Sequence, residues 1–156
     1  MVLNKKFELE LEEINDDKEK YKIKRMLTED RTLSMVLVSA YFNEPATITE
    51  ISNLCSKINL FEVDRSVVWR KIKVLSNIDL VKVKHITDVL SHPDGPEDDL
   101  IRQKWRKFLT RFEGNPLMVK RFKSMSFVIV TKKGEKFIEW AIEKHKLPFK
   151  LKKKVV

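Results

Sequence analysis

The stretch DRSVVWRKIKVLSNIDLVKVK, residues 64–84, indicates the architecture of the chain better than any other segment. Asp64 is a favourable residue for the start of a helix. Val68, Ile72 and Leu75 then recur at the spacing that places apolar side chains on one side of a helix. The second part of the stretch alternates apolar and basic residues, as half-buried strands do. The stretch therefore predicts a capped helix that leads directly into a strand.

The opposite side of this predicted helix is polar and basic. It carries Ser66, Trp69, Arg70, Lys73 and Asn77, which fall within one sector of a helical projection. A solvated surface is the ordinary use of such a face. A surface that contacts a polyanion is the functional alternative, and the choice depends on the elements around the helix.

A helix is predicted before this stretch, in TEDRTLSMVLVSAYFNEP (residues 28–45). Thr28 is the expected cap, and Leu33 and Leu37 belong to its apolar stripe. Pro45 is expected to end it. The segment predicts one buried helix.

A second, short helix is predicted in TITEISNLCSKI (residues 47–58). Thr47 and Glu50 have the spacing of a capping box, although Thr49 is an alternative cap. Cys55 lies on the apolar side and is expected to be a small buried residue rather than a reactive thiol.

The end of the chain predicts a strand in SFVIVT (residues 126–131) and a helix in TKKGEKFIEWAIEKH (residues 131–145). A basic tail, residues 147–156, follows and is expected to be loosely held. Residues 88–125 separate the two predicted strands. This insertion begins with an acidic loop, and Pro96 followed by acidic residues predicts the start of a further helix.

The inserted helix is expected to be both apolar and basic. Ile101, Trp105, Phe108 and Phe112 recur at helical spacing, and residues 100–125 hold eight basic residues against one acidic residue. Three uses of this helix are open. Its apolar stripe packs on its own domain, or the stripe pairs with that of a second copy, or the basic face extends a phosphate-binding surface, and the last two uses are compatible.

The N-terminal segment FELELEEINDDKEKYKIKRM alternates with a period of two. A turn at Asp16 would place Glu12 opposite Lys20 and Glu10 opposite Lys22. Such pairs favour a β-hairpin within residues 1–27. A charged helix is the competing interpretation, since Glu and Lys are good helix formers.

Charge is distributed unevenly. The net charge is +9, and residues 1–63 carry 9 basic and 12 acidic side chains, whereas residues 64–156 carry 23 and 11. A basic excess confined to one part of the chain suggests a polyanion as partner. The 24 Lys residues beside a single Gln are also typical of thermophile proteins, in which Lys is abundant for other reasons.

Several functional classes are disfavoured. The three glycines are isolated, so no glycine-rich phosphate loop is expected, and the three histidines lack the spacing of a metal site. We therefore expect no enzyme activity, no cofactor and no metal. The absence of a long apolar run and of a secretory signal predicts an intracellular protein with no membrane span.

The order of the predicted elements resembles the winged-helix DNA-binding proteins, in particular small archaeal and bacterial transcription regulators. The resemblance rests on ITEISNLC and on residues 64–84, and on FVIVTKKGEKFIEWAIE, in which Thr131 and Gly134 match the Thr-x-x-Gly step after the wing. It implies an α+β fold, a winged helix-turn-helix over residues 28–146. The insertion at 88–125 departs from the family, whose wing tip is short.

The resemblance also implies a function. The helix at 64–77 would enter the major groove of double-stranded DNA, with Arg70 contacting guanine. Trp69 would touch a thymine methyl group or pack against the inserted helix. The expected DNA-binding residues are Thr49, Arg65, Ser66, Trp69, Arg70, Lys73, Asn77, Lys82, Lys84, Arg102, Arg106 and Lys107.

The wider hypothesis is a DNA-associated regulator of transcription that acts as a homodimer. The basic residues 152–154 of the tail are expected to assist. Two alternatives stay open: a winged helix that binds another protein within a transcription or replication assembly, and an architectural protein that binds DNA without sequence preference.

Overall fold

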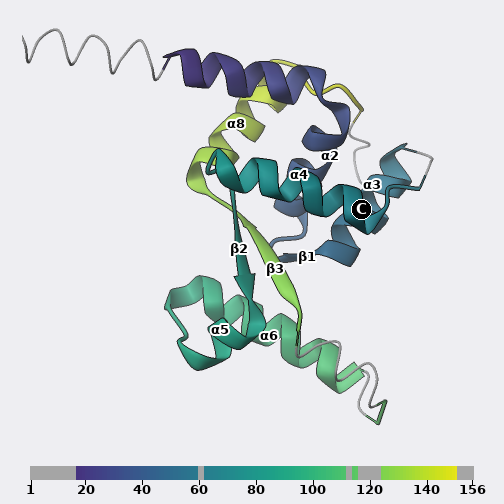
Figure 1. Cartoon of the computed structure of the whole chain (residues 1–156), viewed down its shortest axis with the longest axis vertical. Coiled ribbons are helices and arrows are strands. Elements are labelled where there is room, and N and C mark those ends of the chain that lie inside the picture. The colour runs from purple at the N-terminus through teal and green to yellow at the C-terminus, as the bar shows by residue number, and fades with distance from the viewer. Residues whose placement is uncertain (1–16, 60–61, 112–113, 116–123, 151–156) are drawn as a thin grey trace, which may run out of the picture.

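The computed structural model describes residues 17–59, 62–111, 114–115 and 124–150. The fold is α+β, with helices around a small antiparallel sheet whose strand order is β1-β3-β2 (Figure 1). The elements are an N-terminal helix (residues 17–29), α2 (Arg31–Phe42), β1 (Ala46–Thr47), α3 (Ile48–Asn59), α4 (Arg65–Asn77), β2 (Val81–His85), α5 (Ile86–Ser91), α6 (Gly95–Arg111), β3 (Ser126–Val130) and α8 (Lys132–Glu143).

The starts of α3 and α4 confirm the predicted caps. Asp64 is the N-cap of α4, and its carboxylate accepts a hydrogen bond from the Ser66 amide. Thr47 and Glu50 form a complete capping box: the Thr47 amide donates to Glu50 at 3.0 Å, and the Glu50 amide donates to Thr47 Oγ1 at 3.2 Å. These local bonds satisfy amides that a helix start otherwise leaves without partners.

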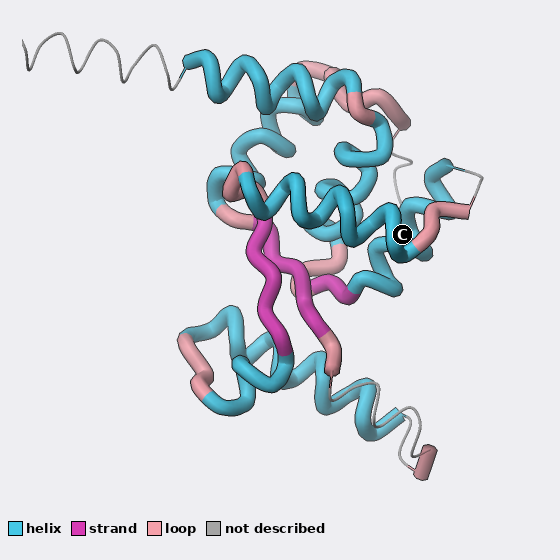
Figure 2. The backbone as a smooth tube through the Cα atoms, in the orientation of Figure 1, coloured by secondary structure: helices cyan, strands magenta, loops and turns pink. Residues whose placement is uncertain are grey.

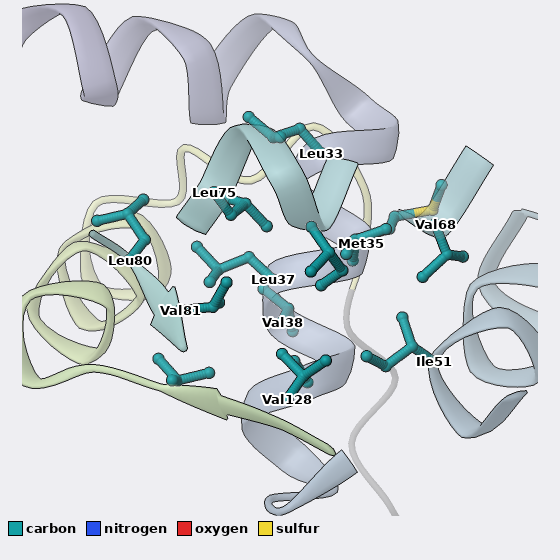
Figure 3. Close-up of a cluster of buried hydrophobic side chains, with 14 of the residues drawn as sticks. Leu33, Met35, Leu37, Val38, Ile51, Val68, Leu75, Leu80, Val81 and Val128 are labelled. Atoms are coloured by element: carbon teal, nitrogen blue, oxygen red, sulfur yellow. The ribbon is translucent and has the colours of Figure 1, made fainter. Parts of the chain in front are cut away.

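The main core forms where α2, α3 and α4 pack together over one face of the sheet (Figure 3). α2 is its centre, since every side chain from Leu33 to Ala40 is buried. Val68, Ile72 and Leu75 of α4 are fully buried, as predicted. Cys55 is also buried in this core, and burial raises the pKa of its thiol, which confirms it as a packing residue.

The other face of the sheet is covered by α5 and α6. Phe127 and Ile129 of β3 point to this side and form a second buried cluster with Ile86, Val89 and Ile101. Figure 2 shows α5 and α6 near the end of β2 and the start of β3, apart from the remaining helices. β3 is therefore buried on both faces. Ile101 packs within its own chain, which is the first of the three uses considered for the stripe.

α6 runs from Lys84 of β2 toward the residues that flank β1. Near its start, Asp98 binds Lys84 of β2 at 2.7 Å. One turn after Ile101, Lys104 reaches Glu50 at 2.7 Å and also donates to the carbonyl of Asn43 at 3.2 Å. The insertion is thus anchored at both sides of the sheet, and it carries the second half of α6 beyond β1.

The predicted N-terminal hairpin is wrong for its second strand, because residues 17–29 form a helix. Ile23 and Leu27, four residues apart, are buried in the main core. Thr28 is not the cap of the following helix. Its hydroxyl donates to the carbonyl of Lys24 inside the N-terminal helix, and Asp30 caps α2 instead. Residues 1–16, the proposed first strand and turn, lie outside the described residues.

The junction of β3 and α8 is closely packed. Thr131 caps α8 by accepting the Gly134 amide at 3.0 Å, and its hydroxyl donates to the Asp79 carbonyl at 2.6 Å. A Cβ atom at Gly134 would lie 2.2 Å from the carbonyl oxygen of Leu80. The Thr-x-x-Gly step therefore holds the end of β3 against the start of β2.

Two predicted boundaries need correction. β2 ends at His85, and residues 86–91 form the short helix α5, where no helix was predicted. The tail was expected to be loosely held from residue 147, but Leu147 and Phe149 pack against the main core. Residues 152–154 lie outside the described part of the chain.

Candidate nucleic-acid interface

The outer face of α4 presents the polar stripe that the sequence predicts. Ser66, Arg70, Lys73 and Asn77 are all exposed, on the side opposite the buried residues of the helix. Since α4 packs on α2 and α3 through its inner face, this outer face is available to a partner.

All the charged side chains of α4 are basic, since the helix contains no acidic residue. Lys71, on its flank, is paired with Asp30 at 2.9 Å. Arg65, Arg70 and Lys73 are exposed and form no ion pair with any residue in the described part of the chain. Their charges are thus free to meet an anionic ligand.

Trp69 and Val74 change the composition expected for this face. Trp69 is half-buried and packs against the main core, so its suggested packing against the inserted helix is wrong. Val74 is 38% exposed and lies one turn beyond Arg70. Sequence reasoning missed Val74, although a valine outside the buried stripe of an otherwise basic helix was a visible signal.

The start of α3 lies beside the second half of α6. Thr49 is exposed in the first turn of α3. The neighbouring Glu50 is only partly exposed and its carboxylate is paired with Lys104. Lys104 therefore offsets the single negative charge that the first turn of α3 would otherwise present.

The basic residues of α6 have different surroundings. Arg102 forms an ion pair with Asp99 in the preceding turn. Arg106 and Lys107 are exposed. These two lie beyond Lys104, in the half of the helix that extends past the sheet, and they are the members of the predicted set in α6 that best suit a ligand.

Lys82 and Lys84 both lie near acidic residues of α6, but Lys84 is partly buried there, whereas Lys82 is 54% exposed. The Lys84 ammonium lies 2.7 Å from Asp98 and 3.2 Å from Glu97, and Lys82 lies 3.9 Å from Glu97. The Asp98 side chain is only 4% exposed. The hydrogen bond from Lys84 holds the pKa of Asp98 below its usual value, and the same bond raises the pKa of Lys84. Lys84 thus anchors the insertion, and we do not include it in the interface.

The described residues were also compared with the requirements of a metal site. No group of three or more His, Cys, Asp or Glu side chains there could hold a metal ion. His85 caps α5, since its Nδ1 accepts a hydrogen bond from the Thr87 amide at 3.3 Å. Within the described ranges no helix has the length and apolarity needed to cross a membrane.

A further group of exposed residues, three basic and one aromatic, lies on the N-terminal helix. Lys18, Tyr21, Lys22 and Arg25 recur at helical spacing opposite the buried side of this helix. Sequence reasoning missed this stripe because it assigned these residues to a strand, in which they would not share a face.

Comparison with known proteins yields no relative: no family model, no curated protein and no solved structure matches the chain.

Proposed function

We propose that this chain is a winged helix-turn-helix protein that binds double-stranded DNA and regulates transcription by reading a specific sequence. The order of elements supports the fold: α2, β1, α3 and α4 precede the antiparallel pair of β2 and β3, and α8 closes the domain. In this reading α3 and α4 are the helix-turn-helix. β2 and β3 are the wing, and α5 and α6 replace its tip.

The exposed, acid-free face of α4 is the observation that carries the DNA-binding proposal. α4 enters the major groove, where the fork of the Arg70 guanidinium matches O6 and N7 of guanine. Lys73 and Ser66 contact phosphate or base edges, and Asn77 contacts phosphate near the end of the helix. Arg65, Thr49, Arg106 and Lys107 add phosphate contacts around this centre.

A DNA-binding protein is favoured over a protein-binding module. Such a module would present large apolar groups on α4, but Trp69 is half-buried against the core, which leaves Val74 as the exposed apolar side chain of this helix. The assay below separates a sequence-specific regulator from an architectural protein. The homodimer stays a prediction without a defined surface. Ile101 is buried in its own chain and Trp105 packs beside it, so these members of the α6 stripe already have an intramolecular role.

The test is Arg70→Ala, measured by competition between a fragment selected from genomic DNA and random duplex. We expect the variant to lose about 1–3 kcal/mol of discrimination at one base pair, while its thermal stability is unchanged. Lys136→Ala removes an exposed charge from α8 and is the matched control. Unchanged affinity and unchanged preference in Arg70→Ala would reject α4 as the recognition helix. Uniform wild-type binding would favour an architectural protein, and no binding would favour a protein-binding module.

A further inference from the structure

The N-terminal helix lies beside the second half of α4. At one end, Lys133 of α8 joins the two helices: its ammonium binds Glu19 at 2.7 Å and the carbonyl of Ile78 at 3.1 Å, directly after α4. At the other end, Asp30 follows the N-terminal helix and binds Lys71 of α4. The two helices therefore run in opposite directions along each other, as Figure 1 shows in its upper half.

The outer side of the N-terminal helix is a basic stripe with one aromatic residue, and we call it the α1 stripe. It consists of Lys18, Tyr21, Lys22 and Arg25. Tyr21 is 68% exposed, which makes it the most exposed large apolar side chain of the described residues. On the opposite side, Ile23 and Leu27 are buried in the main core, so the orientation of the stripe is fixed by packing.

The charges around this stripe favour an anionic partner. The acid Glu19 is occupied by Lys133, and Glu29 at the end of the helix pairs with Arg25. Lys18 and Lys22 form no ion pair with any described residue. A second copy of the chain would bring like charges together here, whereas a phosphate strand would meet two lysines and the hydroxyl of Tyr21, each a suitable donor to phosphate.

We propose that the α1 stripe binds the DNA phosphate strand that borders the groove occupied by α4. This inference rests on the proposed function and extends it to a surface outside the helix-turn-helix. A helix in the major groove has a phosphate strand on each side. The N-terminal helix lies on one side of α4, held there by Lys133 and Lys71, and its lysines extend the footprint in that direction.

The experiment compares three full-length proteins: the wild type, Lys18→Gln/Lys22→Gln, and the control Lys144→Gln/Lys146→Gln, which loses the same charge beyond the end of α8. Affinities for a selected site and for random duplex are measured at several salt concentrations. For the α1 variant we expect roughly a tenfold loss on both DNAs and a slope of log K against log salt that is smaller by about 1.8. Backbone footprinting should lose protection on one side of the site only.

The outcomes separate this inference from the proposed function. If the α1 variant binds like the wild type while Arg70→Ala is impaired, the α1 stripe does not contact DNA and the role of α4 stands. An equal loss in the control variant would show a response to net charge alone and would reject the α1 stripe as a contact. If the wild type binds no DNA, both proposals fail together.

Discussion

Of the three glycines, Gly134 is the one with no room for a side chain. A Cβ atom at this position would lie 2.2 Å from the Leu80 carbonyl oxygen and 2.8 Å from Val130. Gly134→Ala should therefore lower the free energy of unfolding by about 2–3 kcal/mol, although alanine favours a helix over glycine by about 1 kcal/mol. Chemical denaturation measures this difference. Lys132→Ala, at an exposed site in the same turn, should stay within about 0.5 kcal/mol of the wild type.

Asp98 predicts a pH dependence of stability. Because its folded pKa is below the ordinary carboxyl value, its contribution is complete above that ordinary value and is lost as pH falls through the folded pKa. Asp98→Asn should cost about 2 kcal/mol at pH 7 and less at pH 3, which lies below the ordinary carboxyl pKa. Urea denaturation at both pH values tests this. The exposed neighbour Asp99 supplies the control Asp99→Asn, and an equal loss for Asp98→Asn at both pH values would contradict the prediction.

The residue-level features that sequence reasoning predicted are local ones. Asp64, Thr47 and Glu50 bond to amides within three residues, so the spacing of the letters contains the interaction. Asp98 and Lys84 meet across 14 positions, and no local pattern indicates that an acid at the start of a helix will be buried against a strand lysine. Ion pairs between residues that are distant in the sequence could therefore not be predicted.

At the scale of elements, the contact between α6 and α3 can be tested by mutating both members of its ion pair, Lys104 and Glu50. Lys104 and Glu50 are only 22% and 31% exposed, which reduces but does not remove screening by water. A double-mutant cycle with Lys104→Met and Glu50→Gln should give a coupling energy of about 1 kcal/mol. Denaturation midpoints of the four proteins provide the measurement. A coupling energy near zero would mean that the ion pair does not help to hold α6 on the sheet.

The N-terminal element was mispredicted because charge pairs were given more weight than apolar spacing. Glu and Lys residues alternate with apolar residues in parts of the segment 8–24, but Glu and Lys are also good helix formers. Ile23, Met26 and Leu27 have helical spacing, and the core buries or contacts all three. α5 was missed for a different reason: six residues are too few to show a helical period.

At the scale of the whole molecule, the insertion behaves as a second layer on the sheet. His85 and Ser126 are paired at the end of β2 and β3, so Asn-Gly in place of residues 86–125 can close a hairpin between them. This deletion uncovers Phe127 and Ile129, and we expect a protein that aggregates or is less stable by several kcal/mol. Adding Phe127→Thr and Ile129→Lys should restore solubility, which light scattering and thermal denaturation can follow. A fully soluble deletion without these changes would contradict the role of the layer.

The candidate interface was predicted only in part. The exposed stripe of α4 follows from helical periodicity alone, because one buried face defines the other. Arg106 and Lys107 were expected on a basic helix, but the direction of that helix across the sheet depends on Lys84 and Lys104, whose partners are distant in sequence. The α1 stripe required the correct element type for residues 17–29, and the hairpin prediction concealed it.

β3 has a position that no other strand in the described part of the chain shares. Its residues Phe127 to Val130 are buried on both faces, and the strand pairs with β1 on one edge and with β2 on the other. Amide protons in such a position are released to solvent only when the layers on both sides separate. In hydrogen–deuterium exchange the β3 amides should therefore be among the slowest of the described residues and should report global unfolding, while α5 exchanges earlier. The exchange rate of the β3 amides thus measures global unfolding, and the local opening of either layer can be compared with it.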